Sequence, residues 1–196
     1  MPVAAARALP SDKPVNQMQS PDPGQNYFEL LGLKPVFDID ASELHAAQQR
    51  LQATYHPDRH VGANPADRRA SVQMASWINQ AYETLRDPVK RSRYLLEING
   101  ANMPDESATT GDAEFLMEQL ELREAVDGCR ESDQPLDSCE RIETRLEQRA
   151  GELAAEFVSL IEAGQLDEAV ESSRKMQFIQ RIQQQLSELQ FELEDA

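Results

Sequence analysis

Residues 51–69 read LQATYHPDRHVGANPADRR, and they set two helices on either side of a short loop. The first helix is expected to end before His56-Pro57-Asp58, because proline disfavours helical backbone in the residue that precedes it. A second helix is expected to begin at residues 64–65, where an asparagine cap is followed by a first-turn proline. The stretch therefore predicts an exposed, charged and proline-stiffened loop between two helices able to pack antiparallel.

Apolar residues on both sides of this loop recur at spacings of three and four, which is the pattern of an amphipathic helix. Before the loop, behind an N-cap at Asp40, the stripe is Leu44, Ala47, Leu51 and Tyr55. After the loop, the expected inward stripe is Ala70, Met74, Trp77 or Ile78, Ala81 and Leu85. A short helix at residues 27–31, stopped by Gly32, and a fourth helix from Asp87-Pro88 complete an N-terminal unit of four helices.

A turn-rich stretch, NGANMPDESATTG at residues 99–111, separates this unit from three longer helical patterns. We expect these helices at about residues 112–131, 137–163 and 167–194, with Pro135 and Gly164 as the breaks. Short connections between long helices favour antiparallel neighbours. With no strand pattern in the sequence, the predicted fold class is all-α.

The balance of acidic and basic residues also changes between the two predicted units. Residues 25–99 have nine acidic and nine basic side chains, whereas residues 112–196 have 22 acidic and eight basic ones. The acidic half argues against a nucleic-acid groove, which needs concentrated Lys and Arg. Residues 1–24 contain five prolines and few large apolar groups, so we expect a disordered arm.

Neither a membrane nor a metal is expected. No run approaches the roughly 20 apolar residues of a membrane span, and the N-terminus lacks a secretory apolar region. Cys129 and Cys139 form no C-x-x-C pair and have no nearby histidine, so they are expected to be buried or idle thiols and not zinc ligands.

The helix around Phe115 has two apolar faces. At about 100° per residue, Phe115, Leu122 and Val126 cluster in one direction. A second group on another side consists of Leu116, Met117 and Leu120, bordered by Glu121 and Glu124. Periodicity leaves two interpretations open, a helix buried nearly all round or an exposed docking patch, and the two glutamates favour the patch.

Phe178 and a set of arginines are less specific signals. Phe178 lies beside the apolar stripe of the last helix, either as a core boundary residue or as an aromatic extension of the patch. The basic side chains around the loop are Arg50, Arg59, Arg68 and Arg69. They form either a positive surface that steers an acidic partner or an ordinary solvated helix face.

Catalysis by this chain is not expected. His56 and Asp58 could be read as an acid–base pair, but the rigid proline between them makes an orienting hydrogen bond awkward. The sequence also has no Gly-rich phosphate loop, metal cluster or nucleophile motif.

Three segments resemble a J-domain, the four-helix module that stimulates ATP hydrolysis by DnaK-type chaperones. They are YFELLGL at 27–33, YHPDR at 55–59 and INQAYETL at 78–85. The family usually has lysine after the aspartate, and Arg59 keeps that charge.

The second half is similar to HscB, the J-type co-chaperone family of iron–sulfur cluster assembly. FLMEQLELRE at 115–124 resembles the start of that family's C-terminal domain, and RSRYLL at 91–96 the end of its J-domain. The resemblance covers about residues 26–196 and implies an L-shaped protein. The implied parts are a disordered arm (1–24), a J-domain (25–98), a linker (99–111) and a three-helix scaffold-binding bundle (112–196).

The resemblance implies two partners, no cofactor and no covalent chemistry. The chaperone HscA would bind at His56, Pro57, Asp58, Arg50 and Arg59, and its ATPase would be stimulated there. The scaffold protein IscU would bind at Leu116, Met117, Leu120, Glu121, Glu124 and Phe178. Delivering both partners together would raise their local concentration.

Two other interpretations stay open. The chain could be a general J-domain co-chaperone of DnaK with other clients, although it lacks the Gly/Phe-rich and Cys-rich regions of that class. It could also be an enzyme or a helical structural protein in which the tripeptide is incidental. The family's eukaryotic members have an N-terminal zinc segment that this sequence lacks, so we expect a bacterial, cytoplasmic protein.

Overall fold

The computed structural model describes residues 24–56, 58, 64–102 and 112–195, and every regular element in these ranges is helical. The predicted arm, apart from Gly24, and residues 103–111 of the predicted linker lie outside the described residues. So do Pro57 and Arg59 of the predicted chaperone-binding set. The predicted all-α class is confirmed for the described part.

The N-terminal unit contains four helices. They are α1 (Tyr27–Leu31), α2 (Ala41–Tyr55), α3 (Pro65–Arg86) and α4 (Pro88–Ile98). Each begins at a polar side chain that accepts hydrogen bonds from free backbone N–H groups. These caps are Asn26, Asp40, Asn64 and Asp87. Local sequence therefore determines where these helices begin, and the predicted starts of the second, third and fourth helices are confirmed.

Each of the four helices contributes one face to the core of this unit. The side chains that are at most 2% exposed include Phe28, Leu44, Ala47, Ile78, Ala81, Leu85, Leu95 and Leu96. Of the two candidates in α3, Ile78 is fully buried and Trp77 is only half-buried. The prediction for Ala70 was wrong, because Ser71 occupies the buried position. The Ser71 hydroxyl donates a hydrogen bond to the backbone carbonyl oxygen of Tyr55 at 3.1 Å, so both polar groups have a partner.

The C-terminal unit is a bundle of three long helices with a short 3-10 helix between the first two. Its elements are α5 (Ala113–Gly128), η2 (Cys129–Glu131), α6 (Pro135–Glu162) and α7 (Leu166–Glu194). Pro135 opens α6 and does not precede it as predicted, because a first-turn proline leaves no helical hydrogen bond unmade. Gly164 has φ 72°, which suits glycine, and it ends α6 as predicted.

Apolar residues that recur at helical spacing along α6 and α7 form the centre of the bundle. Their fully buried members are Leu146, Leu153, Phe157, Ile179, Ile182 and Leu186. Ile142, Leu160, Ile161 and Leu193 pack at the edge of this core and are only partly buried. Helical spacing thus accounts for which face of each helix points inward, but not for how deeply each residue is buried.

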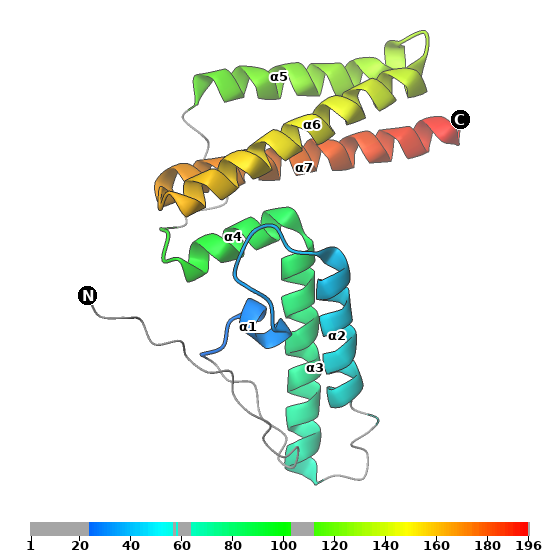
Figure 1. Ribbon diagram of the computed structural model, residues 1–196. Helices are drawn as coiled ribbons and strands as arrows, with labels where there is room; N and C mark the ends of the chain where they lie inside the picture. Colours follow the sequence, from blue (N-terminus) through cyan, green and yellow to red (C-terminus); the bar gives the residue numbers. More distant parts are fainter. Residues whose placement is uncertain (1–23, 57, 59–63, 103–111, 196) are drawn as a thin grey trace, which may run out of the picture.

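The two units meet through α4 and the loop that precedes α2. Ser92 Oγ on α4 lies 2.7 Å from Ser173 Oγ on α7, and both side chains are buried. On the side of α6, the ring of Phe37 packs against that of Phe157. The bundle consequently lies across one end of the α2–α3 hairpin, and α5 lies on the side of the bundle away from α4 (Figure 1). The predicted L-shaped arrangement is confirmed.

Candidate functional site

The loop that begins at His56 connects α2 to α3, and the ends of these two helices that it joins lie farthest from the bundle (Figure 1). His56 is the C-cap of α2, with extended backbone, and its side chain is 57% exposed. The Asp58 side chain is 86% exposed. Both groups are therefore available to another molecule, as the sequence predicted.

The geometry of this pair does not suit acid–base catalysis. The Asp58 backbone N–H donates to His56 Nδ1 at 3.3 Å, whereas the Asp58 carboxylate oxygen is 3.8 Å from the same nitrogen. That second distance is beyond a hydrogen bond. A neutral His56 ring in this arrangement has its proton on Nε2, which remains a donor for a partner. The loop thus presents an imidazole N–H and a carboxylate together.

Basic side chains flank this loop on both helices. Arg50 is exposed on the penultimate turn of α2, and Arg68 and Arg69 are exposed on the first turns of α3. With Pro65, Val72 and Gln73, the two α3 arginines line an open depression of about 480 Å³. A partner that docks here meets positive charge on either side of His56 and Asp58.

The second candidate surface lies on α5, and its exposure resolves the two interpretations of that helix. Phe115, Leu122 and Val126 are 3%, 1% and 6% exposed and face the bundle. The opposite residues Leu116, Met117 and Leu120 are 40%, 59% and 51% exposed, and we name these three the outer face of α5. Three neighbouring exposed large apolar side chains on one helix are typical of a protein-docking patch.

Charged and aromatic groups border the outer face on both sides. Toward α6, Glu121 forms an exposed ion pair with Arg145 at 3.5 Å, and Glu124 is exposed nearby on α5. Toward α7, the half-buried ring of Phe178 meets Phe115 edge to face, with ring centroids 5.6 Å apart. Phe178 is thus both a core boundary residue and a flank of the patch.

Sequence reasoning missed the polar contacts that attach α5 to the other two helices. Lys175 Nζ on α7 lies 2.6 Å from the Asp112 carboxylate, which caps α5. This hydrogen bond is the main cause of the lowered pKa of Asp112. On the α6 side, Arg149 binds Glu118 through two nitrogens. Long-range pairs of this kind have no local signal in the sequence.

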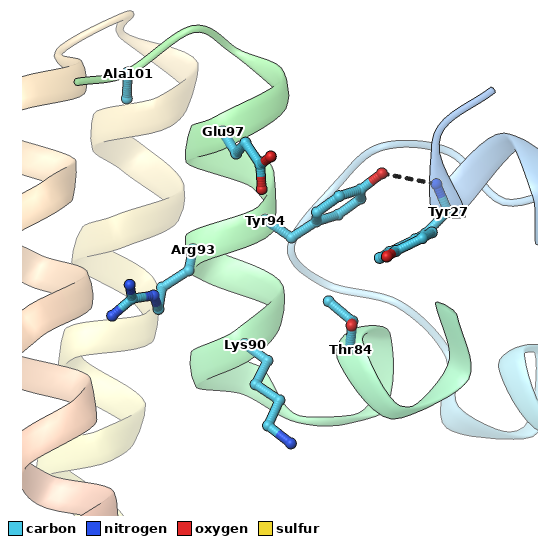
Figure 2. Close-up of a pocket in the computed structure, with 7 residues that line it drawn as sticks. All are labelled: Tyr27, Thr84, Lys90, Arg93, Tyr94, Glu97 and Ala101. Carbon is cyan, nitrogen blue, oxygen red and sulfur yellow. Dashed lines mark hydrogen bonds between the residues drawn. The ribbon is translucent and has the colours of Figure 1, made fainter. Parts of the chain in front are cut away.

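An open depression of about 590 Å³ lies on the N-terminal unit, and none of its lining residues belongs to either surface (Figure 2). Its wall is the stacked pair Tyr27 and Tyr94, whose ring centroids are 4.4 Å apart. The Tyr27 backbone N–H donates to the Tyr94 hydroxyl at 2.9 Å, and burial raises the pKa of both phenols. These contacts hold α1 against α4, so the tyrosines are structural.

Metal binding and membrane insertion find no support in the described ranges. Within them, no three His, Cys, Asp or Glu side chains are grouped so that they could hold a metal ion. No helix of the described chain combines the length and apolar character needed to cross a membrane. Cys129 and Cys139 are free thiols, 1% and 0% exposed.

Comparison with known families separates the chain into the same two units. Residues 26–94 match the family model of the DnaJ domain, and residues 111–187 match that of the HSCB C-terminal oligomerisation domain. A loop with His56 and Asp58 between two antiparallel helices, joined to such a bundle, defines a J-domain co-chaperone.

Individual relatives identify the family within the class of J-domain co-chaperones. The co-chaperone protein HscB homolog of Shewanella halifaxensis is 36% identical over 174 residues, which are 87% of this chain and 99% of that protein. Co-chaperone protein HscB of Proteus mirabilis is 35% identical over 171 residues, with the same coverage. This chain belongs to the HscB family.

Solved structures of the family have the same fold. Chaperone HscB from Vibrio cholerae superposes with a TM-score of 0.78 at 32% identity, covering 86% of this chain and 99% of that one. The human co-chaperone protein HscB gives 0.79 at 28% identity, covering 86% and 84%. The arrangement of J-domain and bundle is therefore shared with members as distant as the human one.

Proposed function

We propose that this chain couples an iron–sulfur scaffold protein of the IscU type to a DnaK-type chaperone of the HscA type. His56, Pro57 and Asp58, with Arg50 and Arg59, contact the chaperone and stimulate its ATPase. The scaffold binds the outer face of α5 together with Glu121, Glu124 and Phe178. The chain itself forms no covalent bond with either partner, and we expect it to act in the bacterial cytoplasm.

One observation supports this division of labour above the others. The outer face of α5 is exposed although the same helix has a complete buried face, and α5 itself lies on the opposite side of the bundle from the J-domain. A partner bound there does not cover the loop at the far end of the α2–α3 hairpin. Both partners can therefore be held at once, which raises their effective concentration for each other.

The ATPase rate of HscA, measured with IscU present and with or without this protein, tests the proposal. We expect the ATPase rate of HscA to rise only when this protein and IscU are both present. His56→Gln should abolish this rise and leave IscU binding intact. Stimulation of DnaK but not of HscA would replace the proposal by a general J-domain role. No effect on either chaperone would contradict both.

A further inference from the structure

Hydrophobic burial alone does not determine how α5 is turned about its axis. It buries three large apolar side chains, Phe115, Leu122 and Val126, and exposes three more on the outer face. Turning the helix would bring a second set of three large apolar side chains against the bundle in place of the first. Polar contacts at the border of the two faces can specify a single orientation for such a helix.

The pair between Glu118 and Arg149 supplies a contact of this kind. Arg149 Nε donates to Glu118 Oε1 at 2.8 Å and Nη2 donates to Oε2 at 3.1 Å, so the guanidinium and the carboxylate meet as two parallel forks. A bidentate pair of this geometry tolerates little rotation of either group. Glu118 lies on the flank of α5 that faces α6, between the buried face and the outer face.

This pair is closer and less exposed than the ion pair of Glu121 and Arg145 along the same border. The side chains of Glu118 and Arg149 are 22% and 29% exposed, against 62% and 53% for Glu121 and Arg145. Burial by itself would lower the pKa of Arg149, but the hydrogen bonds and charge of Glu118 raise it above the ordinary value. Arg149 also donates to Glu152 at 3.2 Å, which holds the guanidinium against its own helix.

We propose that Arg149 is a positioning residue, which through Glu118 holds α5 in the rotation that presents its outer face to the scaffold. Its importance for the scaffold rests on the proposed function. The rotation itself can be measured without any partner.

Thiol accessibility measures the rotation directly. Leu120→Cys places a thiol on the outer face and Val126→Cys places one on the buried face, while the native Cys129 and Cys139 are buried. Each variant is treated with a maleimide, alone and combined with Arg149→Gln. We expect the thiol at position 126 to react about tenfold faster once the charged hydrogen bonds are lost. An unchanged rate in a folded protein would overturn the proposal.

Two matched changes separate orientation from general stability. Arg141 lies on the same helix, and its described hydrogen bonds run to Ser138 and Asp137 of that helix. Arg141→Gln removes this charge and should leave the labelling rate at position 126 unchanged. Exchanging the charges, Glu118→Arg with Arg149→Glu, should restore slow labelling at position 126. Fast labelling in the exchanged protein, with helicity intact by circular dichroism, would also overturn the proposal.

Scaffold binding then tests the consequence. Arg149→Gln should weaken the binding of apo-IscU about tenfold and leave the stimulation of HscA at saturating IscU unchanged. Equal binding by the variant and the native chain would overturn the positioning role. If the native chain binds no IscU, the proposed function fails, while the labelling rates still decide whether Arg149 sets the rotation.

Discussion

The ring of Phe37, in the loop before α2, packs against the ring of Phe157 on α6 with centroids 5.1 Å apart and an interplanar angle of 56°. Phe37 is 7% exposed and Phe157 is fully buried. The Arg91 guanidinium lies over the Phe37 ring, 4.8 Å from its centroid. One side chain of a loop thus joins the J-domain to the bundle.

We expect Phe37→Ala to lower the free energy of unfolding by about 3–5 kcal/mol, because it removes a buried ring and leaves a cavity between the units. Urea titration followed by circular dichroism measures the loss. The neighbouring Val36→Ala is the control, since Val36 is 46% exposed and surface changes usually stay within about 0.5 kcal/mol. Equal effects of the two changes would show that the interdomain contact does not form in solution.

The serine pair between α4 and α7 predicts an asymmetric result. Ser92 Oγ donates to the Val89 carbonyl at 2.8 Å, so its only hydrogen is used and it accepts from Ser173. Ser92→Ala leaves the buried Ser173 hydroxyl without this acceptor and should cost about 1–3 kcal/mol. Ser173→Ala leaves Ser92 bonded to Val89 and should cost less.

A double-mutant cycle checks this assignment. Replacing both serines by alanine removes both polar groups together, so the loss of stability should be smaller than the sum of the two single losses. Additive effects would mean that the hydroxyls do not interact in solution.

Periodicity and capping were sufficient to predict the helices, but they could not predict where the units join. Asp40, Asn64 and Asp87 are local signals, and each caps the helix that follows it. The contact of Phe37 with Phe157 links positions 120 residues apart, so no window of sequence contains it. Contacts of this kind follow only from the packed fold.

Small polar side chains were the other source of error. Ser71, Ser92 and Ser173 are at most 2% exposed, although hydroxyl residues are usually placed on the surface. Each is buried because its hydroxyl meets a carbonyl or a second hydroxyl. The outer face of α5 was recognised because its residues are too apolar for the exposed side of a helix, whereas the Arg149 contact was missed.

The buried thiol of Cys139 predicts a loss of stability at alkaline pH. Burial first, and then the hydrogen bond with Cys129, raises the Cys139 pKa from 9.0 to about 11. Between these values the unfolded chain loses the thiol proton and the folded chain keeps it. The stability that the protonated Cys139 thiol contributes is fully present below about pH 9 and is lost as the pH rises toward 11.

Urea titrations at pH 7 and pH 10.5 in the presence of a reductant measure this loss. Tyr27 and Tyr94 also have raised pKa values and add to the decline in the same direction. Cys139→Ala is therefore compared with the native chain, and its decline should be the shallower of the two. Identical slopes would assign the whole effect to the tyrosines and other groups.

The exposure of the outer face of α5 predicts that its side chains contribute to the binding of IscU and contribute little to the stability of the fold. Replacing Leu116, Met117 and Leu120 by alanine should weaken the binding of IscU, because these side chains offer apolar surface that a partner can bury. The fold should change little, since the same side chains are 40% to 59% exposed. Binding is measured by titration calorimetry, and stability by urea titration of the same samples.

Leu122→Ala is the matched control on the same helix. Leu122 is 1% exposed and packs in the bundle core, so its truncation should cost about 2–5 kcal/mol of stability. Scaffold affinity, measured where this variant is still folded, should fall less than in the triple variant. If the triple variant unfolds as readily as Leu122→Ala, the outer face belongs to the core in solution. If it stays folded and binds IscU with native affinity, the scaffold binds elsewhere.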